Sequence, residues 1–215
     1  WFDSHRVGIR GLSDSRQSKY ENIERMTNKA VEKSLTKPSS RKEMTTLQNQ
    51  DGTTQNLDTY VNHLLCDEDK MYPASLNEWE KHVVKTELKR DKTEFWYRNP
   101  SGGETISLAI PYDDGDVKRL LRPDFIFFGR KADGELAVDI VDPHGLHNAD
   151  ALPKLRGLAR YAEKEGDKYN RIESIALVNK EYLVLDLKNS GVRDAINSGA
   201  SAKNLFEGSN STPYQ

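Results

Sequence analysis

The sequence predicts an α/β fold in which a central mixed sheet follows a helical, partly flexible N-terminal extension. From Met71 onward the hydrophobic spacing runs through helix, three or four strands, helix, strand and strand, the order of a compact mixed sheet. Two of these strands form an apolar hairpin that carries acidic residues. Earlier residues are polar and poor in aromatics, so we divide the chain into an extension (1–70), a compact domain (71–200) and a polar tail (201–215).

The composition excludes several classes of protein. Of 215 residues, 35% are hydrophobic and 31% charged, which excludes a membrane-spanning, collagen-like or strongly acidic disordered chain and indicates a soluble one with no membrane partner. Cys66 is the only cysteine, so a disulfide scaffold and a multi-cysteine zinc site are excluded, and a reducing cytoplasm fits. The net charge of −2 excludes an evenly basic coat for nucleic acid, but not a local basic groove beside an acidic metal site.

The N-terminal extension has one predicted helix and one predicted linker. Apolar residues at helical spacing favour a helix over residues 15–35, and a stretch rich in Ser, Thr, Gln and Asn predicts a linker over residues 36–56. The chain starts at Trp1, and no apolar signal segment follows a basic start, so we expect it to be part of a longer protein.

The compact domain begins with a helix and strands. Ser75 and Glu78 have the spacing of a capping box, and an apolar stripe behind them predicts a helix over residues 75–90. Aromatic residues predict a strand over 93–98. An alternating apolar run predicts another strand over 106–110, which the following proline ends.

An apolar hairpin forms the predicted centre of the sheet. Residues 122–128 have the pattern of a buried central strand, and residues 135–142 that of its partner. Between them, KADG at 131–134 predicts a tight turn. We expect a three-residue loop with Gly134 in the left-handed conformation, a geometry that fixes the register of the two strands.

A helix and two closing strands complete the domain. Asn148 or Asp150 can cap a helix that ends at Gly166. Three shorter elements are expected after it: strands over 172–178 and 182–187 and a helix over 192–196.

Three aspartates lie where the hairpin is otherwise apolar. Asp124 precedes the apolar run of the first strand, and Asp139 and Asp142 lie within and at the end of the second. Unpaired buried carboxylates are strongly disfavoured, so a cation is expected near them. The three-residue loop places Asp124 opposite Asp142, which we prefer, whereas a one-residue slip would bring Asp139 beside Asp124. A salt bridge with Arg122 or Lys154 is the structural alternative for Asp139.

The paired aspartates predict a divalent-metal site. Two carboxylates, a strand carbonyl and waters suit Mg²⁺ or Mn²⁺, which can activate water and neutralise charge on a phosphodiester. His144, two residues after Asp142, is placed to position or deprotonate that water, and Lys154 in the next helix to stabilise the phosphate. The alternatives are an ordinary Asp-Pro turn at 142–143 and an ordinary surface lysine.

Motifs of several other enzyme classes are absent. The sequence contains no GxxxxGK[ST], GxGxxG, GxSxG, HExxH or CxxC, which argues against ATP hydrolysis within this chain. His63, His82 and His147 show no metal-ligand spacing, and we assign them no role.

The acidic hairpin resembles the PD-(D/E)xK nuclease superfamily. Pro123-Asp124 matches the PD element, and Asp142-Pro143-His144-Gly145 resembles the second element with histidine in place of its lysine. The resemblance implies a restriction-endonuclease-like core: helix, three-stranded meander, helix, strands. It also implies that a glutamate of the first helix, Glu80 or Glu87, can reach the metal.

A longer stretch, residues 60–187, resembles the C-terminal nuclease region of DEAD/DEAH-box helicases similar to the type III restriction subunit. The segments that carry this resemblance are WYRNP, RPDFIFF, VDIVDPHG and DALPKLRGLARYAE. It implies DNA cleavage beside a helicase or ATPase region, in the same or a partner chain, and a role in restriction or antiviral defence.

Aromatic and basic residues near the hairpin are candidate DNA contacts. Trp96, Tyr97 and Arg98 can stack on bases or clamp a phosphate, although an aromatic strand is more often core. A basic face can follow the DNA backbone or be an ordinary solvated surface; its members are Arg119, Arg122, Lys154, Arg156 and Arg160.

The sequence therefore predicts a DNA endonuclease that depends on Mg²⁺ or Mn²⁺. The candidate catalytic residues are Asp124, Asp139, Asp142, His144 and Lys154, and the candidate metal ligands are the three aspartates with Glu80 and Glu87. Because the motif lysine is absent, the alternative is a catalytically inactive module of the same fold that binds DNA or a partner subunit. An RNA-directed nuclease is a third hypothesis.

Overall fold

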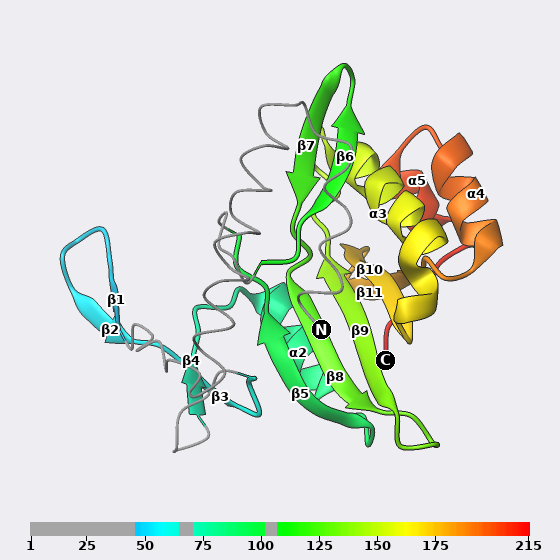
Figure 1. Cartoon of the computed structure of the whole chain (residues 1–215). Coiled ribbons are helices and arrows are strands. Elements are labelled where there is room, and N and C mark those ends of the chain that lie inside the picture. Colours follow the sequence, from blue (N-terminus) through cyan, green and yellow to red (C-terminus); the bar gives the residue numbers. More distant parts are fainter. Residues whose placement is uncertain (1–45, 65–70, 102–106) are drawn as a thin grey trace, which may run out of the picture.

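A mixed sheet forms the centre of the protein. The structure is a computed structural model that describes residues 46–64, 71–101 and 107–215 (Figure 1). The strands of the sheet are β5 (Thr93–Arg98), β8 (Phe125–Arg130), β9 (Leu136–Pro143), β10 (Arg171–Val178), β11 (Glu181–Asp186) and β12 (Thr212–Pro213). They lie in the order β12-β11-β10-β9-β8-β5, and every pair is antiparallel except β9 and β10, which are parallel. The predicted mixed α/β fold is confirmed.

Helices cover both faces of the sheet. One face packs against α2 (Glu78–Glu87), whose Val83 and Val84 lie in a core with Phe125 and Val141. The other face packs against α3 (Ala151–Glu165), which makes the crossover between the parallel strands. Beside α3 lie α4 (Ser190–Ser198) and α5 (Ala202–Glu207) (Figure 1). Successive residues of β8 and β9 point to opposite faces, so their apolar runs fill both cores.

An additional hairpin interrupts the run from β5 to β8. It consists of β6 (Ile110–Asp114) and β7 (Val117–Leu121), and it projects beyond the main sheet on the side of α3 (Figure 1). The prediction that Pro111 ends a strand is wrong, because Pro111 lies within β6. In a two-stranded sheet each strand has one unpaired edge, so a residue without a backbone N–H is tolerated there. Tyr112 packs so closely on α3 that a Cβ added at Gly157 would lie 2.4 Å from the Tyr112 Cβ.

The first helix begins later than predicted. Asn77, not Ser75, is the N-cap: its side chain accepts from the N–H groups of Trp79 and Glu80, both at 2.9 Å. The Glu80 carboxylate completes the capping box by accepting from the Asn77 N–H at 2.7 Å. Leu76, just before the cap, is buried in the core, and this contact favours the later start.

The boundaries of the compact domain also differ from prediction. The helix predicted over 15–35 lies outside the described residues. The linker predicted over 36–56 is wrong from Thr46 onward, because β1 (Thr46–Gln48) and β2 (Thr54–Asn56) pair as a hairpin. Next come β3 (Thr59–Val61) and β4 (Met71–Pro73), and His63 forms a parallel bridge with Trp96. Part of the predicted extension therefore extends the β5 edge.

The predicted polar tail is part of the fold. Leu205 and Phe206 of α5 are buried in the core under α3, and Tyr214 is buried in the core under α2. The prediction of a polar tail missed these apolar residues, because each is surrounded in the sequence by small and polar residues. The compact domain consequently reaches residue 215.

The remaining elements lie close to their predicted positions. Asp150 is the residue before α3, but its side chain makes no cap hydrogen bond, and at Gly166 the helix passes into a short 3-10 helix, η2 (Gly166–Lys168). In the part of the chain that is described, none of the helices has the length and apolarity needed to cross a bilayer.

Candidate functional site

The turn between β8 and β9 sets the register that brings two acids together. The Lys131 N–H donates to the Glu135 carbonyl at 2.9 Å, and Gly134 has a φ of +84°, as expected for a three-residue loop with a left-handed glycine. Phe125 consequently pairs with Val141. The next residues outward are Asp124 and Asp142, so the predicted register is confirmed.

Asp124 and Asp142 are in direct contact at this end of the hairpin. The Asp124 N–H donates to Asp142 Oδ1 at 3.1 Å. The buried Asn99 side chain donates to the Pro123 carbonyl at 2.8 Å, and the Asn99 N–H donates to the Asp124 carbonyl at 2.9 Å. The backbone on both sides of Asp124 is therefore fixed by hydrogen bonds.

Asp142 and His144 form a buried pair. Only 4% of Asp142 and 6% of His144 is exposed, and His144 Nδ1 lies 3.5 Å from Asp142 Oδ2. The neighbouring strand holds both residues, since the His144 N–H donates to the Ile175 carbonyl at 2.6 Å and Ser174 Oγ donates to the Asp142 carbonyl at 3.3 Å. His144 Nε2 is buried and has no hydrogen-bond partner among the described residues.

A cavity of about 450 Å³ lies beside Asp124. The start of α2, including Asn77 and Glu80, forms one wall, and Pro143 and Gly145 contribute to the other. Of the two predicted helix ligands, Glu80 lines this cavity and Glu87 does not; Glu78, at the start of α2, lines it as well. The Glu80 carboxylate is already bound by Arg98 Nη2 at 2.8 Å, and Arg98 also donates to the Ser75 carbonyl.

The site carries more negative charge than its own cations neutralise. Burial, followed by the charges of Asp142 and Glu80, raises the pKa of Asp124 to about 8, although Arg98 and Lys154 act in the opposite direction. Lys154 is itself paired with Asp150 at 2.9 Å. A carboxyl group that keeps its proton near neutral pH in such surroundings is one that an added cation can ionise.

The residues present fit a metal held by two carboxylates. Asp124 and Asp142 are adjacent and supply hard oxygen ligands, which a strand carbonyl and waters can complete. Within the described ranges, no three side chains of His, Cys, Asp or Glu come together as a metal-binding group. Glu80 remains engaged by Arg98, so the fit rests on the two aspartates.

Two predicted metal ligands lie elsewhere. Asp139 is three residues before Asp142, so its side chain points to the other face of the sheet, where Arg171 binds it at 2.8 Å. Glu87 is two helical turns, roughly 10 Å, from Glu80 and also binds Arg171, at 2.5 Å. The salt bridge considered for Asp139 therefore exists, but its partner is Arg171 rather than Arg122 or Lys154.

Several candidate DNA contacts have structural roles. Trp96 and Tyr97 are 0% and 1% exposed, so their rings cannot stack on bases. Arg156 donates to the carbonyls of Ile196 and Gly199 at the end of α4. Three basic residues are placed differently: Arg119 pairs with Asp114, Arg160 pairs with Asp113, and Arg122 has a buried Nε with no partner among the described residues.

Arg171 is the important polar residue that the sequence did not reveal. It starts β10 and binds Glu87, Asp139 and Glu173. A lone arginine before an apolar run is an ordinary strand boundary, and its three acidic partners come from elements far apart in sequence or from its own strand. Asp139 within an apolar run was the only signal that a buried cation was present.

Comparison with known proteins gives a family. The family model described as the YagJ family matches residues 61–215. The chain is 42% identical over 215 residues to "Protein YagJ" of Escherichia coli (strain K12), an alignment that covers 100% of this chain and 88% of that protein. No solved structure matches the chain. With more than half of its length matched, the chain belongs to the YagJ family.

Proposed function

We propose that the chain is a metal-dependent endonuclease domain that hydrolyses phosphodiester bonds in DNA. One observation carries the proposal: Asp124 and Asp142 meet at the end of the β8–β9 hairpin, beside a cavity of about 450 Å³. Asp124 lines the cavity, the buried Asp142 contacts it, and the pKa of Asp124 is raised to about 8; together these features favour a bound cation.

The order of elements supports this proposal. Apart from the inserted hairpin, α2 is followed by the antiparallel meander β5, β8 and β9, then by α3 and the parallel strand β10. That order is the one implied by the resemblance to PD-(D/E)xK nucleases. Pro123-Asp124 and Asp142-Pro143-His144 lie at the two strand ends that such a site requires.

The chain supplies ligands and polar groups around the proposed reaction. Asp124 and Asp142 would hold Mg²⁺ or Mn²⁺, which when bound supplies an activated water and neutralises charge on the phosphate. The Asp142 carboxylate orients the His144 ring through Nδ1 and leaves Nε2 without a partner among the described residues, so His144 can accept a proton. Lys154 lies close enough to lower the pKa of Asp124 and can neutralise a phosphate after leaving Asp150.

The resemblance extends the proposal to partners and setting. It places the domain beside a helicase or ATPase region, in the same or a partner chain, in restriction or antiviral defence in the cytoplasm. These parts of the proposal rest on the resemblance alone.

A catalytically inactive module that binds DNA or a partner subunit is the second candidate. Two observations favour it: histidine occupies the place of the motif lysine, and Arg98 already neutralises Glu80. Metal binding separates the two candidates, because the inactive module needs none.

Calorimetric titration with Mn²⁺ and cleavage of supercoiled plasmid test the proposal. We expect the unaltered chain to bind Mn²⁺ and to nick or linearise plasmid DNA with Mg²⁺ or Mn²⁺. Asp124→Asn is expected to abolish both, whereas Asp116→Asn, at an exposed position in the β6–β7 turn, should change neither. An RNA substrate offered in parallel tests the RNA-directed alternative.

The outcomes separate the candidates. Cleavage that survives in Asp124→Asn overturns the assignment of the site. DNA binding without any Mn²⁺ affinity or cleavage favours the inactive module over the nuclease.

A further inference from the structure

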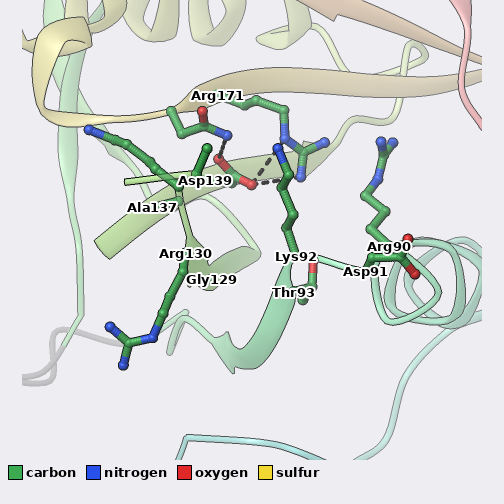
Figure 2. A pocket seen from close by; sticks show the side chains of 12 residues that line it. Arg90, Asp91, Lys92, Thr93, Gly129, Arg130, Ala137, Asp139 and Arg171 are labelled. Atoms are coloured by element: carbon green, nitrogen blue, oxygen red, sulfur yellow. Dashed lines mark hydrogen bonds and ion pairs between the residues drawn. The ribbon is translucent and has the colours of Figure 1, made fainter. Parts of the chain in front are cut away.

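A second cavity, of about 410 Å³, lies at the opposite end of the hairpin from Asp124 (Figure 2). The turn that follows α2, the β8–β9 turn and the start of β10 line it. Along β8, Gly129 in its lining is five residues from Asp124, roughly 17 Å away. This cavity is therefore separate from the proposed nuclease site.

The floor of the cavity is a saturated ion cluster. All five N–H groups of Arg171 are used: two bind Asp139 Oδ2, two bind Glu87 and one binds Glu173. Asp139 Oδ1 accepts from Asn170 Nδ2 at 2.9 Å. These groups hold one another in place, and Arg171 keeps no free donor for a ligand.

Charge in the floor is close to balanced. Glu87, Asp139 and Glu173 face Arg171 and Arg90, and burial raises the pKa of Glu173 to about 7, which reduces the excess of negative charge near neutral pH. A further cation beside this floor is consequently available to an external anion.

Lys92 is that further cation. Its ammonium group has no hydrogen-bond or ion-pair partner among the described residues, and its side chain points toward the Asp139–Arg171 pair (Figure 2). Its backbone is fixed against β8, since a Cβ added at Gly129 would lie 1.8 Å from the Lys92 carbonyl oxygen. Lys92 therefore starts from a defined position.

Arg90 adds a second source of donors on the same wall. Its Nε binds Glu87 at 3.1 Å and its Nη2 donates to the Gln215 carbonyl at 2.7 Å, which leaves Nη1 without a partner among the described residues. Asp91, the other carboxylate in the lining, is exposed and in Figure 2 lies below the Arg90 guanidinium rather than beside the Lys92 ammonium. Apart from the Asp91 carboxylate, the unused groups here are donors, so the fitting ligand is rich in acceptors.

We propose that this cavity binds the phosphate group of a small phosphate monoester, with Lys92 as the main contact and Arg90 as the second. A phosphate offers several acceptor oxygens and negative charge to an ammonium and a guanidinium. The volume exceeds what inorganic phosphate fills and falls in the range of cavities that hold small organic ligands. The same phosphate chemistry could come from a free nucleotide or from a nucleic-acid chain, and the proposal is the free monoester.

Calorimetry with defined probes tests this proposal. Inorganic phosphate and adenosine 5′-monophosphate are expected to bind to the unaltered chain, and adenosine is not. Lys92→Gln should weaken binding of the monophosphate about tenfold or more, Lys92→Arg should retain most of it, and Lys89→Gln, at a neighbouring exposed lysine outside the lining, should leave it unchanged.

Controls keep the outcomes distinct. Circular dichroism verifies that each variant is folded, and Asp124→Asn should bind the monophosphate normally, so failure of the nuclease proposal leaves this test intact. Monophosphate binding that is unaffected in folded Lys92→Gln overturns the site. Binding confined to a twelve-nucleotide oligonucleotide without terminal phosphate overturns the free monoester.

Discussion

The Asp124 N–H donates to Asp142 Oδ1 at 3.1 Å, so one of the two acids is held by the backbone of the other. This contact holds the Asp142 carboxylate beside the Asp124 backbone without using the Asp124 side chain. Removal of charge at either residue therefore need not disturb the hairpin.

Asp142→Asn should remove metal binding while leaving the fold intact. An asparagine oxygen can still accept from the Asp124 N–H, but the ligand charge is lost. We expect Mn²⁺ affinity to fall below detection in calorimetry and the midpoint of thermal unfolding to change little.

Asp139→Asn, three residues away on the same strand, provides the matched control. It weakens a buried contact with Arg171 and should lower the free energy of unfolding by about 1–3 kcal/mol in urea titration, with Mn²⁺ affinity unchanged. Equal effects of the two substitutions on metal affinity would contradict our division of the aspartates.

His144 is expected to act in proton transfer. His144→Ala should lower kcat for DNA cleavage about 100-fold with little change in KM, because general acid–base groups contribute at least that much. His144→Lys, which restores the motif residue, should keep kcat within about tenfold of the unaltered chain. Equal loss in both variants, measured on folded protein, would argue against this role.

The contact between Gly157 and Tyr112 should matter for stability. Gly157→Ala places a methyl group 2.4 Å from the Tyr112 Cβ, and forcing the β6–β7 hairpin away from α3 should cost about 1–3 kcal/mol. Gly166→Ala is the control, since Gly166 has a helical φ of −57° and open space around it, and should be neutral or slightly stabilising. Urea unfolding of both variants distinguishes steric conflict from a general effect of alanine.

Glu173 should make stability depend on pH. Burial is the main cause that raises its pKa to about 7 from 4.5, and Glu87 and Asp139 raise it further, while Arg171 opposes them. The folded state therefore keeps this proton longer than the unfolded state, so Glu173 contributes stability at low pH that is lost as pH rises from about 4.5 through 7.

Comparison with Glu173→Gln measures this contribution. Between pH 4.5 and 7.5 the unaltered chain should lose about 1–3 kcal/mol of unfolding free energy relative to the variant. Parallel stability curves for the two proteins across this range would contradict the expectation. The measurement needs no metal or substrate.

The sequence correctly predicted those features that depend only on residues close together in the chain. The turn at 131–134 and its left-handed glycine could be recognised from four residues, and they were enough to place Asp124 opposite Asp142. The aromatic strand at 93–98 was equally clear, because its residue types suit only a pleated, packed surface.

Long-range partners could not be read in the same way. The partner of Asp139 proved to be Arg171, which is beside it only because β9 and β10 lie parallel. Glu80 and Glu87 looked equivalent on one helix, yet one faces the cavity and the other is enclosed with Tyr214. The choice between them depends on where α2 crosses the sheet, and that is a property of packing.

The three-residue turn controls a site at the far end of its own strands. Because side chains alternate faces, one inserted or deleted residue between Lys131 and Glu135 would rotate Asp142 away from Asp124 even though neither acid had been altered. The number of residues in this loop is thus under tighter constraint than their types. Natural variation there should therefore substitute residues rather than add or remove them.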